Sequence, residues 1–236
     1  MPLPACFCHD RSIMSASPFN DDAIAAVYQA IHGRRDIREF IPGPLPGGLL
    51  ERIYAAAHAA PSVGYMQPWR LLHISDPALR GALVQLVDEE RLCTAAELPS
   101  RAAEFLQLKV DGIKSCAEVI VVALMDGCEK HLFGKRTLPE MALASAACAI
   151  QNMWLAARAE GIGLGWVSFF DPAALARLCA MPPGAKPIAI LCLGQVAGFP
   201  ERPLLETLGW GQRLPLEAVV FENRWPDDAR PTPTAY

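Results

Sequence analysis

The chain has 236 residues, of which 52% are hydrophobic and 19% are charged, and its formal net charge at pH 7 is -4. These values exclude a disordered chain and a nucleic-acid partner bound through an overall basic surface. A chain of this length can bury the core of one domain, and a subunit interface would hide its surplus of apolar surface.

The N-terminal segment, residues 1–18, carries Cys6-Phe7-Cys8-His9. Two thiols and an imidazole can bind a metal, but no second set of ligands with suitable spacing follows, so we expect a flexible segment and no metal site. The segment has no basic start followed by an apolar core, and the eight cysteines of the chain show no paired spacing. Both observations predict a cytoplasmic protein without disulfides.

Helical and extended patterns alternate through the first half of the chain. Asn20 is a good helix cap for residues 23–32, where apolar side chains recur at helical spacing, and Gly33 ends that helix. The pattern then predicts, in order, a helix over 48–57, a strand over 69–74 and a helix that begins at Asp76-Pro77. Residues 90–100 are less periodic and are predicted to form a mobile loop over a site, and residues 100–114 an amphipathic helix.

The second half of the chain is more apolar. Residues 117–125 form a near-continuous apolar run that is typical of a buried strand. The stretch over 141–157 is Ala-rich, contains polar residues and is too short to span a membrane, so it predicts a helix over about 138–160 that is buried on all sides. The pattern next predicts a strand over 165–170, a helix over 172–180 and a strand over 187–196.

The mixture of helices and short strands predicts an α+β (α/β mixed) fold. No internal repeat and no long linker divides the chain, so we expect one domain over residues 19–226 and a Pro-rich tail over 227–236. Gly161-Ile162-Gly163-Leu164-Gly165 is interpreted as a helix stop and a tight turn. A dinucleotide-binding fingerprint would instead place its glycines between a strand and a following helix.

The first candidate binding segment is Arg34-Arg35-Asp36-Ile37-Arg38. Three guanidinium groups within five residues can surround a phosphate, because each is planar, stays charged and offers several donors. Basic residues are also favoured in the last turn of a helix by its dipole, which gives a purely structural alternative.

Two further segments can bind a polar ligand. Residues 60–69 contain Ser62, Gly64 and Gln67 in a Pro- and Gly-rich stretch, which forces an irregular backbone with exposed donors. An ordinary turn between a helix and a strand is the alternative. Ser168 lies between two apolar residues, and its hydroxyl needs a partner if it is buried, either a backbone carbonyl or a ligand.

Taken together, the three segments resemble the nitroreductase superfamily. Its members have Arg-Arg-Ser-x-Arg-x-Phe near the start, Ala-Pro-Ser-x-x-Asn-x-Gln-Pro-Trp further along and a Gly-rich strand around a flavin ring. The resemblance covers residues 20 to 225, with Asp36 in place of the usual Ser and Tyr65 in place of the usual Asn. Both departures, and the stretches 151–168 and 212–216, resemble the flavin-fragmenting branch, the 5,6-dimethylbenzimidazole synthases.

The resemblance implies a dimeric fold with a central mixed sheet flanked by helices and a site for FMN. It also implies that molecular oxygen and reduced FMN react to give 5,6-dimethylbenzimidazole, the lower ligand of cobalamin, and erythrose 4-phosphate. The implied phosphate ligands are Arg34, Arg35, Arg38 and Arg213. The other implied flavin contacts are Asp36, Ile37, Ser62, Gly64, Gln67, Arg101, Val110 and Ser168.

Asp36 and Ser168 are the implied catalytic residues. A carboxylate can accept a proton where a serine does so less readily, so Asp36 is expected to transfer protons. The alternative is that Asp36 only orients the arginines through a salt bridge.

Other functions are open at this point. The chain resembles, more generally, NAD(P)H-dependent nitroreductases that retain FMN, and a non-catalytic flavin- or phosphate-binding module would carry the same arginines. The expected loop over residues 90–100 also implies that a separate flavin reductase supplies reduced FMN.

Overall fold

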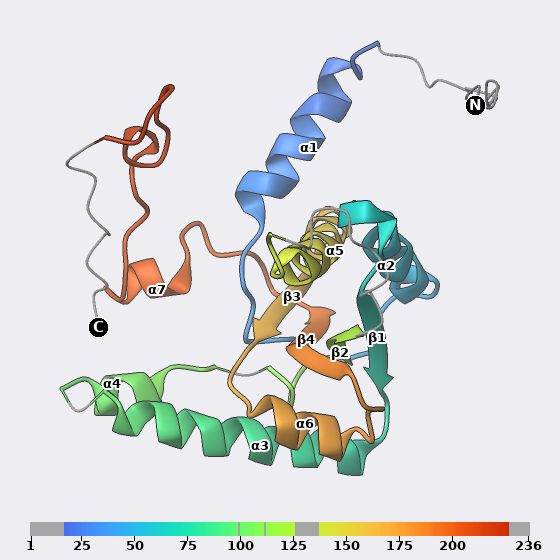
Figure 1. Ribbon diagram of the computed structural model, residues 1–236, viewed down its shortest axis with the longest axis vertical. Coiled ribbons are helices and arrows are strands. Elements are labelled where there is room, and N and C mark those ends of the chain that lie inside the picture. Colours follow the sequence, from blue (N-terminus) through green and yellow to red (C-terminus); the bar gives the residue numbers. More distant parts are fainter. Residues whose placement is uncertain (1–16, 99, 111, 126–136, 227–236) are drawn as a thin grey trace, which may run out of the picture.

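A four-stranded sheet lies at the centre of the molecule with helices on both faces (Figure 1). The structure is a computed structural model and describes residues 17–98, 100–110, 112–125 and 137–226. The Cys6-Phe7-Cys8-His9 segment and the tail over 227–236 lie outside the described residues.

The strands lie in the order β1 (Trp69–Ile74), β2 (Glu118–Met125), β4 (Ala185–Gln195) and β3 (Ile162–Val167). Each neighbouring pair is antiparallel, so the expectation of a mixed sheet is wrong for these strands. One physical reason is the connection through α6 (Pro172–Leu178). Its 7 residues span about 10 Å, whereas the 6 residues of β3 span about 20 Å, so the chain enters β4 near the end where it left β3.

Both faces of the sheet are covered. On β2, Val119 and Val121 pack into one core cluster, while Ile120 and Val122 pack into another. Helices α2 (Leu49–His58) and α5 (Met141–Ala159) cover the second cluster, and α3 (Pro77–Ala96) and α6 cover the first (Figure 1). Burial on both faces explains why the strand reads as a continuous apolar run.

Helix α5 is long and largely apolar as predicted, but it is not buried on all sides. Ser145, Ile150 and Met153 lie in the interior, whereas Leu143 is 45% exposed and Cys148 is also exposed. The helix faces the sheet with one side and also contacts α1 and α2, and part of its outer side stays exposed.

Helix α1 (Asp21–Gly33) begins where predicted, because the side chain of Asn20 accepts a hydrogen bond from the N–H of Ala23 (2.9 Å). It projects from the body of the molecule (Figure 1), and none of its side chains is buried. Its apolar stripe is therefore exposed. The members of this stripe are Ile24, Val27, Tyr28 and Ile31.

Two predicted elements differ from the observed ones. Helix α3 continues through residues 90–96, so most of the expected mobile loop is helical, because Val87 and Ala95 continue the buried stripe of the helix. Helix α4 (Ala102–Gln107) is much shorter than the predicted 100–114. Past its end the chain turns toward Phe40, against which Gly112 packs so closely that a Cβ would lie 2.4 Å from the ring.

Shorter elements complete the chain: η1 (Val63–Tyr65), α7 (Leu204–Thr207) and η3 (Leu216–Ala218). Among the described residues, no helix is both long and apolar enough to cross a membrane. Within the same part of the chain, no group of three or more potential metal ligands gathers. The five described cysteines are all free thiols.

Candidate functional site

The arginine segment leaves the end of α1 and runs beside strand β3. Asp36 forms a parallel bridge with Leu164, and the N–H of Ile37 donates to the Leu164 carbonyl (3.1 Å). A Cβ at Gly165 would lie 2.1 Å from the Ile37 carbonyl oxygen, so only glycine allows this approach. The expected tight turn at residues 161–165 is therefore wrong beyond Gly161: the chain is already in β3 from Ile162 onward.

A cavity of about 550 Å³ opens at this segment. Of the residues implied by the resemblance, it is lined by Arg34, Arg35, Asp36, Arg38, Val110 and Arg213. Ile37 points into the core instead and is buried there.

Most other lining residues were not anticipated. Phe105, Phe169 and Trp210 form an aromatic wall, with Phe105 and Trp210 ring centroids 6.3 Å apart. Lys109 and Arg202 add positive charge, and Glu97 adds a second carboxylate. These residues come from the end of α3, from α4 and the residues after it, from the connection between β3 and α6, and from the C-terminal segment. Their isolated charges and rings were visible in the sequence, but no local pattern shows that distant segments meet.

The three clustered arginines have different partners. Arg35 donates to the carbonyls of His32 (2.8 Å) and Arg34 (2.7 Å) and to that of Glu201, so it mainly closes the end of α1, as the structural alternative expected. Arg38 donates to the Trp166 carbonyl (2.6 Å).

Arg34 has a different environment from its two neighbours. Its guanidinium carbon lies 4.6 Å from the centroid of the Trp154 ring. Burial lowers the pKa of Arg34. The negative charge of Asp36 opposes this effect, and the positive charges of Arg35 and Arg213 lower the pKa further. A bound anion would relieve this repulsion between cations.

Three buried guanidinium N–H groups of this segment have no acceptor among the described residues: Nε of Arg34, Nε of Arg35 and Nη1 of Arg38. Buried donors without acceptors are costly in free energy. Unpaired donors, clustered positive charge and an aromatic wall fit a phosphorylated aromatic ligand, and so fit the FMN that the resemblance implies.

Asp36 occupies the wall of this cavity, held through both of its carboxylate oxygens. Oδ1 accepts the N–H of Trp166 (2.9 Å), and Oδ2 lies 2.6 Å from Nη2 of Arg38. Although 42% of the side chain is open to solvent through the cavity, protein surrounds it on most sides. This desolvation raises the pKa of Asp36 and outweighs the opposing effects of Arg38 and the Trp166 amide.

Two other implied site residues lie outside the lining. Ser168 follows β3 directly, two residues after Trp166, and is exposed; its hydroxyl has no hydrogen-bond partner among the described residues. Arg101 stacks on Trp210, with its guanidinium carbon 3.6 Å from the centroid of the ring, and pairs with Glu104 (3.0 Å). It therefore contacts a residue of the cavity wall without lining the cavity itself.

The loop over Ser62–Gln67 also lies outside this cavity. The backbone is left-handed at Gly64 (φ 57°), Tyr65 (φ 55°) and Gln67 (φ 45°), an accumulation of strain that is typical of functional loops. The Ser62 hydroxyl accepts the N–H of Gln67 (3.1 Å), which fixes the loop internally.

Helix α5 separates this loop from the arginines. The Ser145 hydroxyl, near the start of α5, accepts the N–H of Val63 (3.2 Å). Arg158, near its end, donates from Nε to the carbonyl of Gly33, beside the arginine segment (3.0 Å). The helical rise places Ser145 about 20 Å from Arg158 along the axis. The chain thus holds the two expected halves of the site apart.

Comparison with known proteins gives consistent relationships. Residues 31–195 match the nitroreductase family. A 5,6-dimethylbenzimidazole synthase of Rhodobacter capsulatus is 36% identical over 194 residues, which are 81% of this chain and 94% of that protein. A 5,6-dimethylbenzimidazole synthase of Rhodospirillum rubrum is 35% identical over 203 residues, 84% of this chain and 93% of that protein.

The fold is also similar to solved structures. Iodotyrosine deiodinase bound to FMN and 3-iodo-L-tyrosine superimposes with a TM-score of 0.67 at 19% identity, covering 84% of this chain and 100% of that chain. At this identity the likeness shows the fold, an α+β arrangement with helices packed on the four-stranded sheet.

Proposed function

Because the chain belongs to the nitroreductase family, we propose that it is a 5,6-dimethylbenzimidazole synthase, which uses molecular oxygen to fragment reduced FMN and releases erythrose 4-phosphate. The observation that carries this proposal is the Asp36 carboxylate, placed in the wall of an arginine-lined cavity. Relatives that are 35–36% identical over most of both chains carry the name of this activity.

Arg34, Arg38 and Arg213 would hold the phosphate, since their guanidinium groups line one part of the cavity. Phe105 and Trp210 offer the aromatic surface for the ring. Reduced FMN, when bound, supplies both the electrons for oxygen and the carbon skeleton of the product.

Asp36 is the proton acceptor in this proposal. The Trp166 N–H and Arg38 fix its carboxylate, and each carboxylate oxygen keeps a lone pair for a further proton. Its raised pKa brings its proton affinity closer to neutral pH, where a general base is most effective. Ser168, two residues beyond Trp166, would supply a hydroxyl at the edge of the ring.

We also propose that the protein works as a homodimer. The Ser62–Gln67 loop and the arginines lie at opposite ends of α5, so in a complete site the loop would come from the partner subunit. The exposed apolar stripe of α1 and the open side of α5 would form the interface.

A separate flavin reductase would supply reduced FMN. Leu98, near the end of α3, and Phe105 of α4 form part of the cavity wall and would restrict the entry of a second nucleotide. Stopped-flow reduction of bound FMN by NADH tests this point, and the proposal expects it to be slow.

The activity itself is tested by mixing the protein with chemically reduced FMN without oxygen and then admitting air. We expect flavin absorbance to be lost while 5,6-dimethylbenzimidazole appears by mass spectrometry. Full recovery of oxidised FMN without a new product would reject the synthase. NADPH added to the protein with oxidised FMN would then separate the alternatives: its consumption would identify an ordinary nitroreductase, and its absence a binding module.

A further inference from the structure

Trp154 of α5 contacts the arginine segment although it lies outside the cavity lining. Its indole N–H donates to the carbonyl of Arg35 (3.0 Å), and the guanidinium carbon of Arg34 lies over its ring, 4.6 Å from the centroid. One helical turn further along α5, Nε of Arg158 donates to the carbonyl of Gly33 (3.0 Å). Residues four apart lie on the same side of a helix, so one side of α5 holds the backbone before and after Arg34.

The contact with the ring leaves the hydrogen-bond donors of Arg34 available. The Arg34 side chain makes no hydrogen bond within the part of the chain that the structure describes, and its buried Nε has no acceptor there. A cation–π contact is made through the face of the ring and uses none of the N–H groups of the guanidinium. Trp154 therefore restrains Arg34 without occupying the groups that would bind an anion.

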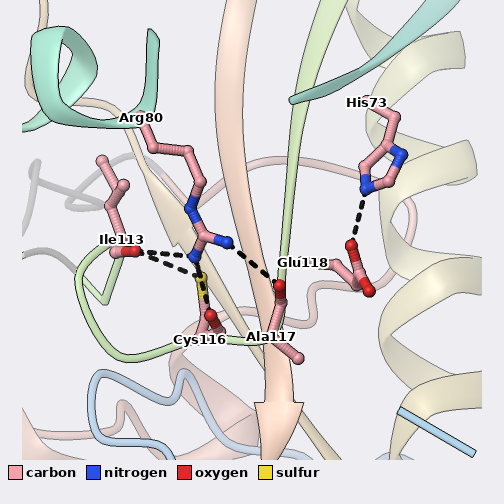
Figure 2. Close-up of polar contacts among 6 residues, drawn as sticks. All are labelled: His73, Arg80, Ile113, Cys116, Ala117 and Glu118. Atoms are coloured by element: carbon pink, nitrogen blue, oxygen red, sulfur yellow. Dashed lines mark hydrogen bonds and ion pairs between the residues drawn. The ribbon is translucent and has the colours of Figure 1, made fainter. Parts of the chain in front are cut away.

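Arg80 of α3 shows how an arginine is held when its role is structural. Its terminal nitrogens donate to three backbone carbonyls at 2.7 to 3.1 Å (Figure 2). These carbonyls belong to Ile113, Cys116 and Ala117. Such bonds fix the guanidinium by using its donors, and they leave it little capacity to bind a ligand. Arg34 keeps that capacity because a ring holds it instead.

The same tryptophan contacts the segment that holds Asp36. The ring centroids of Trp154 and Trp166 are 6.4 Å apart, and the Trp166 N–H donates to Oδ1 of Asp36 (2.9 Å). The carbonyl that Trp154 binds belongs to the peptide bond between Arg35 and Asp36. Trp154 therefore lies against both segments that position the carboxylate.

We propose that Trp154 is a positioning residue, which holds Arg34 ready for the phosphate of the flavin and thereby sets the preference of the site for FMN over riboflavin. The inference rests on the proposed function, since it takes the phosphate to lie at Arg34. A restrained arginine loses less conformational freedom on binding than a mobile one, and only a ligand with a phosphate gains from this. Because Trp154 lies outside the cavity lining, it acts on the ligand through Arg34.

A role in core packing is the alternative for Trp154, because its ring also packs against the core cluster that α2 and α5 cover. Loss of core packing would lower the stability of the fold and weaken the binding of both flavins alike. Loss of the contact with Arg34 would weaken only the ligand that carries a phosphate. The ratio of the two dissociation constants therefore separates the two roles.

The test measures the dissociation constants of oxidised FMN and riboflavin for the full chain by fluorescence titration. Trp154→Leu should bind FMN about 3- to 30-fold more weakly, the range expected for loss of a cation–π contact, and riboflavin as the parent does. Trp154→Phe keeps an aromatic face beside Arg34 and should recover most of the preference for FMN. Trp225→Leu is the matched control, since Trp225 is 74% exposed, and it should leave both constants unchanged.

A double variant tests whether the effect passes through Arg34. In an Arg34→Gln background, Trp154→Leu should not change the ratio of the two constants further, because the cation that the ring contacts is already absent. Losses that add in the double variant would show that Trp154 acts independently of Arg34 and would overturn the proposal. An unchanged ratio in Trp154→Leu alone would overturn it as well.

Failure of this inference can be told from failure of the proposed function. A parent protein that prefers FMN to riboflavin but forms no 5,6-dimethylbenzimidazole would reject the synthase and leave the effect of Trp154 on the ratio standing. A parent that binds neither flavin would reject both. Circular dichroism checks that each variant is folded. If Trp154→Leu does not fold, Trp154→Met, with a longer side chain to fill the same space, takes its place with the same expected ratio.

Discussion

The ion pair between Asp36 and Arg38 bears on both roles considered for the carboxylate. Nη2 of Arg38 lies 2.6 Å from Oδ2 of Asp36, and the same atom donates to the Trp166 carbonyl at 2.6 Å. Because a backbone carbonyl already holds Arg38 in place, Asp36 is not required to orient it. The orienting role alone therefore does not explain a carboxylate at this position, which supports the proposed role of Asp36 in proton transfer.

The raised pKa of Asp36 predicts a specific pH dependence. Turnover should increase as pH rises through this pKa, which lies above that of an ordinary aspartate, because only the carboxylate accepts a proton. The folded state also binds this proton more tightly than the unfolded chain. Its contribution to the free energy of unfolding is therefore present at low pH and lost as pH rises through the folded pKa.

Single-turnover flavin loss and urea unfolding across pH measure both effects, and both should vanish in Asp36→Asn. Asp88→Asn, on α3 outside the cavity, is the matched control. A rate that falls as the carboxylate forms would contradict the assignment.

Arg34 should bind the phosphate of FMN and not its ring. Replacing one charged hydrogen-bonding group removes about 1.5–3 kcal/mol, so Arg34→Gln should weaken FMN binding roughly 10- to 100-fold. Riboflavin, which lacks the phosphate, should bind the variant as it binds the parent. Fluorescence titration measures both ligands, with Arg177→Gln on α6 as control. Equal losses for both ligands would show that Arg34 does not contact the phosphate.

At the scale of elements, the approach of the arginine segment to β3 decides where Asp36 lies. The Ile37 carbonyl and Gly165 are in contact because the glycine has no side chain. Two segments more than a hundred residues apart are thereby fixed together, and the Trp166 N–H is brought to Asp36.

Gly165→Ala should break this contact. The new Cβ would lie 2.1 Å from a backbone oxygen that cannot move independently, so we expect a loss of about 1–3 kcal/mol in the free energy of unfolding together with weaker FMN binding. Gly81→Ala is the matched control, since no atom lies within 4 Å of its Cβ and α3 should gain about 0.5–1 kcal/mol. Urea unfolding compares the two. Similar stability of both variants would mean that the segments are not in close contact.

Local patterns predicted the elements well where the cause was local. Strand β1 matches its predicted range, and the cap at Asn20 formed as expected, because alternation and capping depend on neighbouring residues. The prediction missed the strand over residues 162–164, because its glycines were interpreted as a turn. They are required instead because a distant segment packs on them.

The candidate site was predictable in part for the same reason. The arginines and Asp36 are adjacent in the sequence, and the resemblance identified them together. Trp210 and Phe105 escaped notice because they approach the cavity from separate parts of the chain. The sequence offered a structural role at the end of the first helix as an alternative for these arginines. Only the hydrogen bonds in the structure show that Arg35 takes this role, whereas Arg34 stacks on Trp154.

On the scale of the whole molecule, the exposed apolar surface and the divided site both support the proposed homodimer. The stripe on α1 is exposed along its length, and the Ser62–Gln67 loop lies at the far end of α5 from the arginines. A second copy of the chain would cover the stripe and bring a loop to each set of arginines, which is the basis of the proposed homodimer.

Val27→Glu should dissociate this dimer. A carboxylate in the middle of the apolar stripe would be buried without a partner, so sedimentation should show monomers that bind FMN weakly. Gln29→Glu introduces the same charge on the opposite side of α1 and should leave both properties unchanged. A Val27→Glu dimer with normal FMN affinity would place the interface elsewhere.

The measurement closest to the central claim compares the parent protein with Asp36→Ser, the residue that the resemblance associates with ordinary nitroreductases. Each is loaded with reduced FMN and exposed to air, and the yield of 5,6-dimethylbenzimidazole per flavin is determined by mass spectrometry. We predict product and lost flavin for the parent, and recovered oxidised FMN without product for the variant. Equal yields from both proteins, or none from the parent, would contradict the assignment of Asp36 as the group that directs fragmentation.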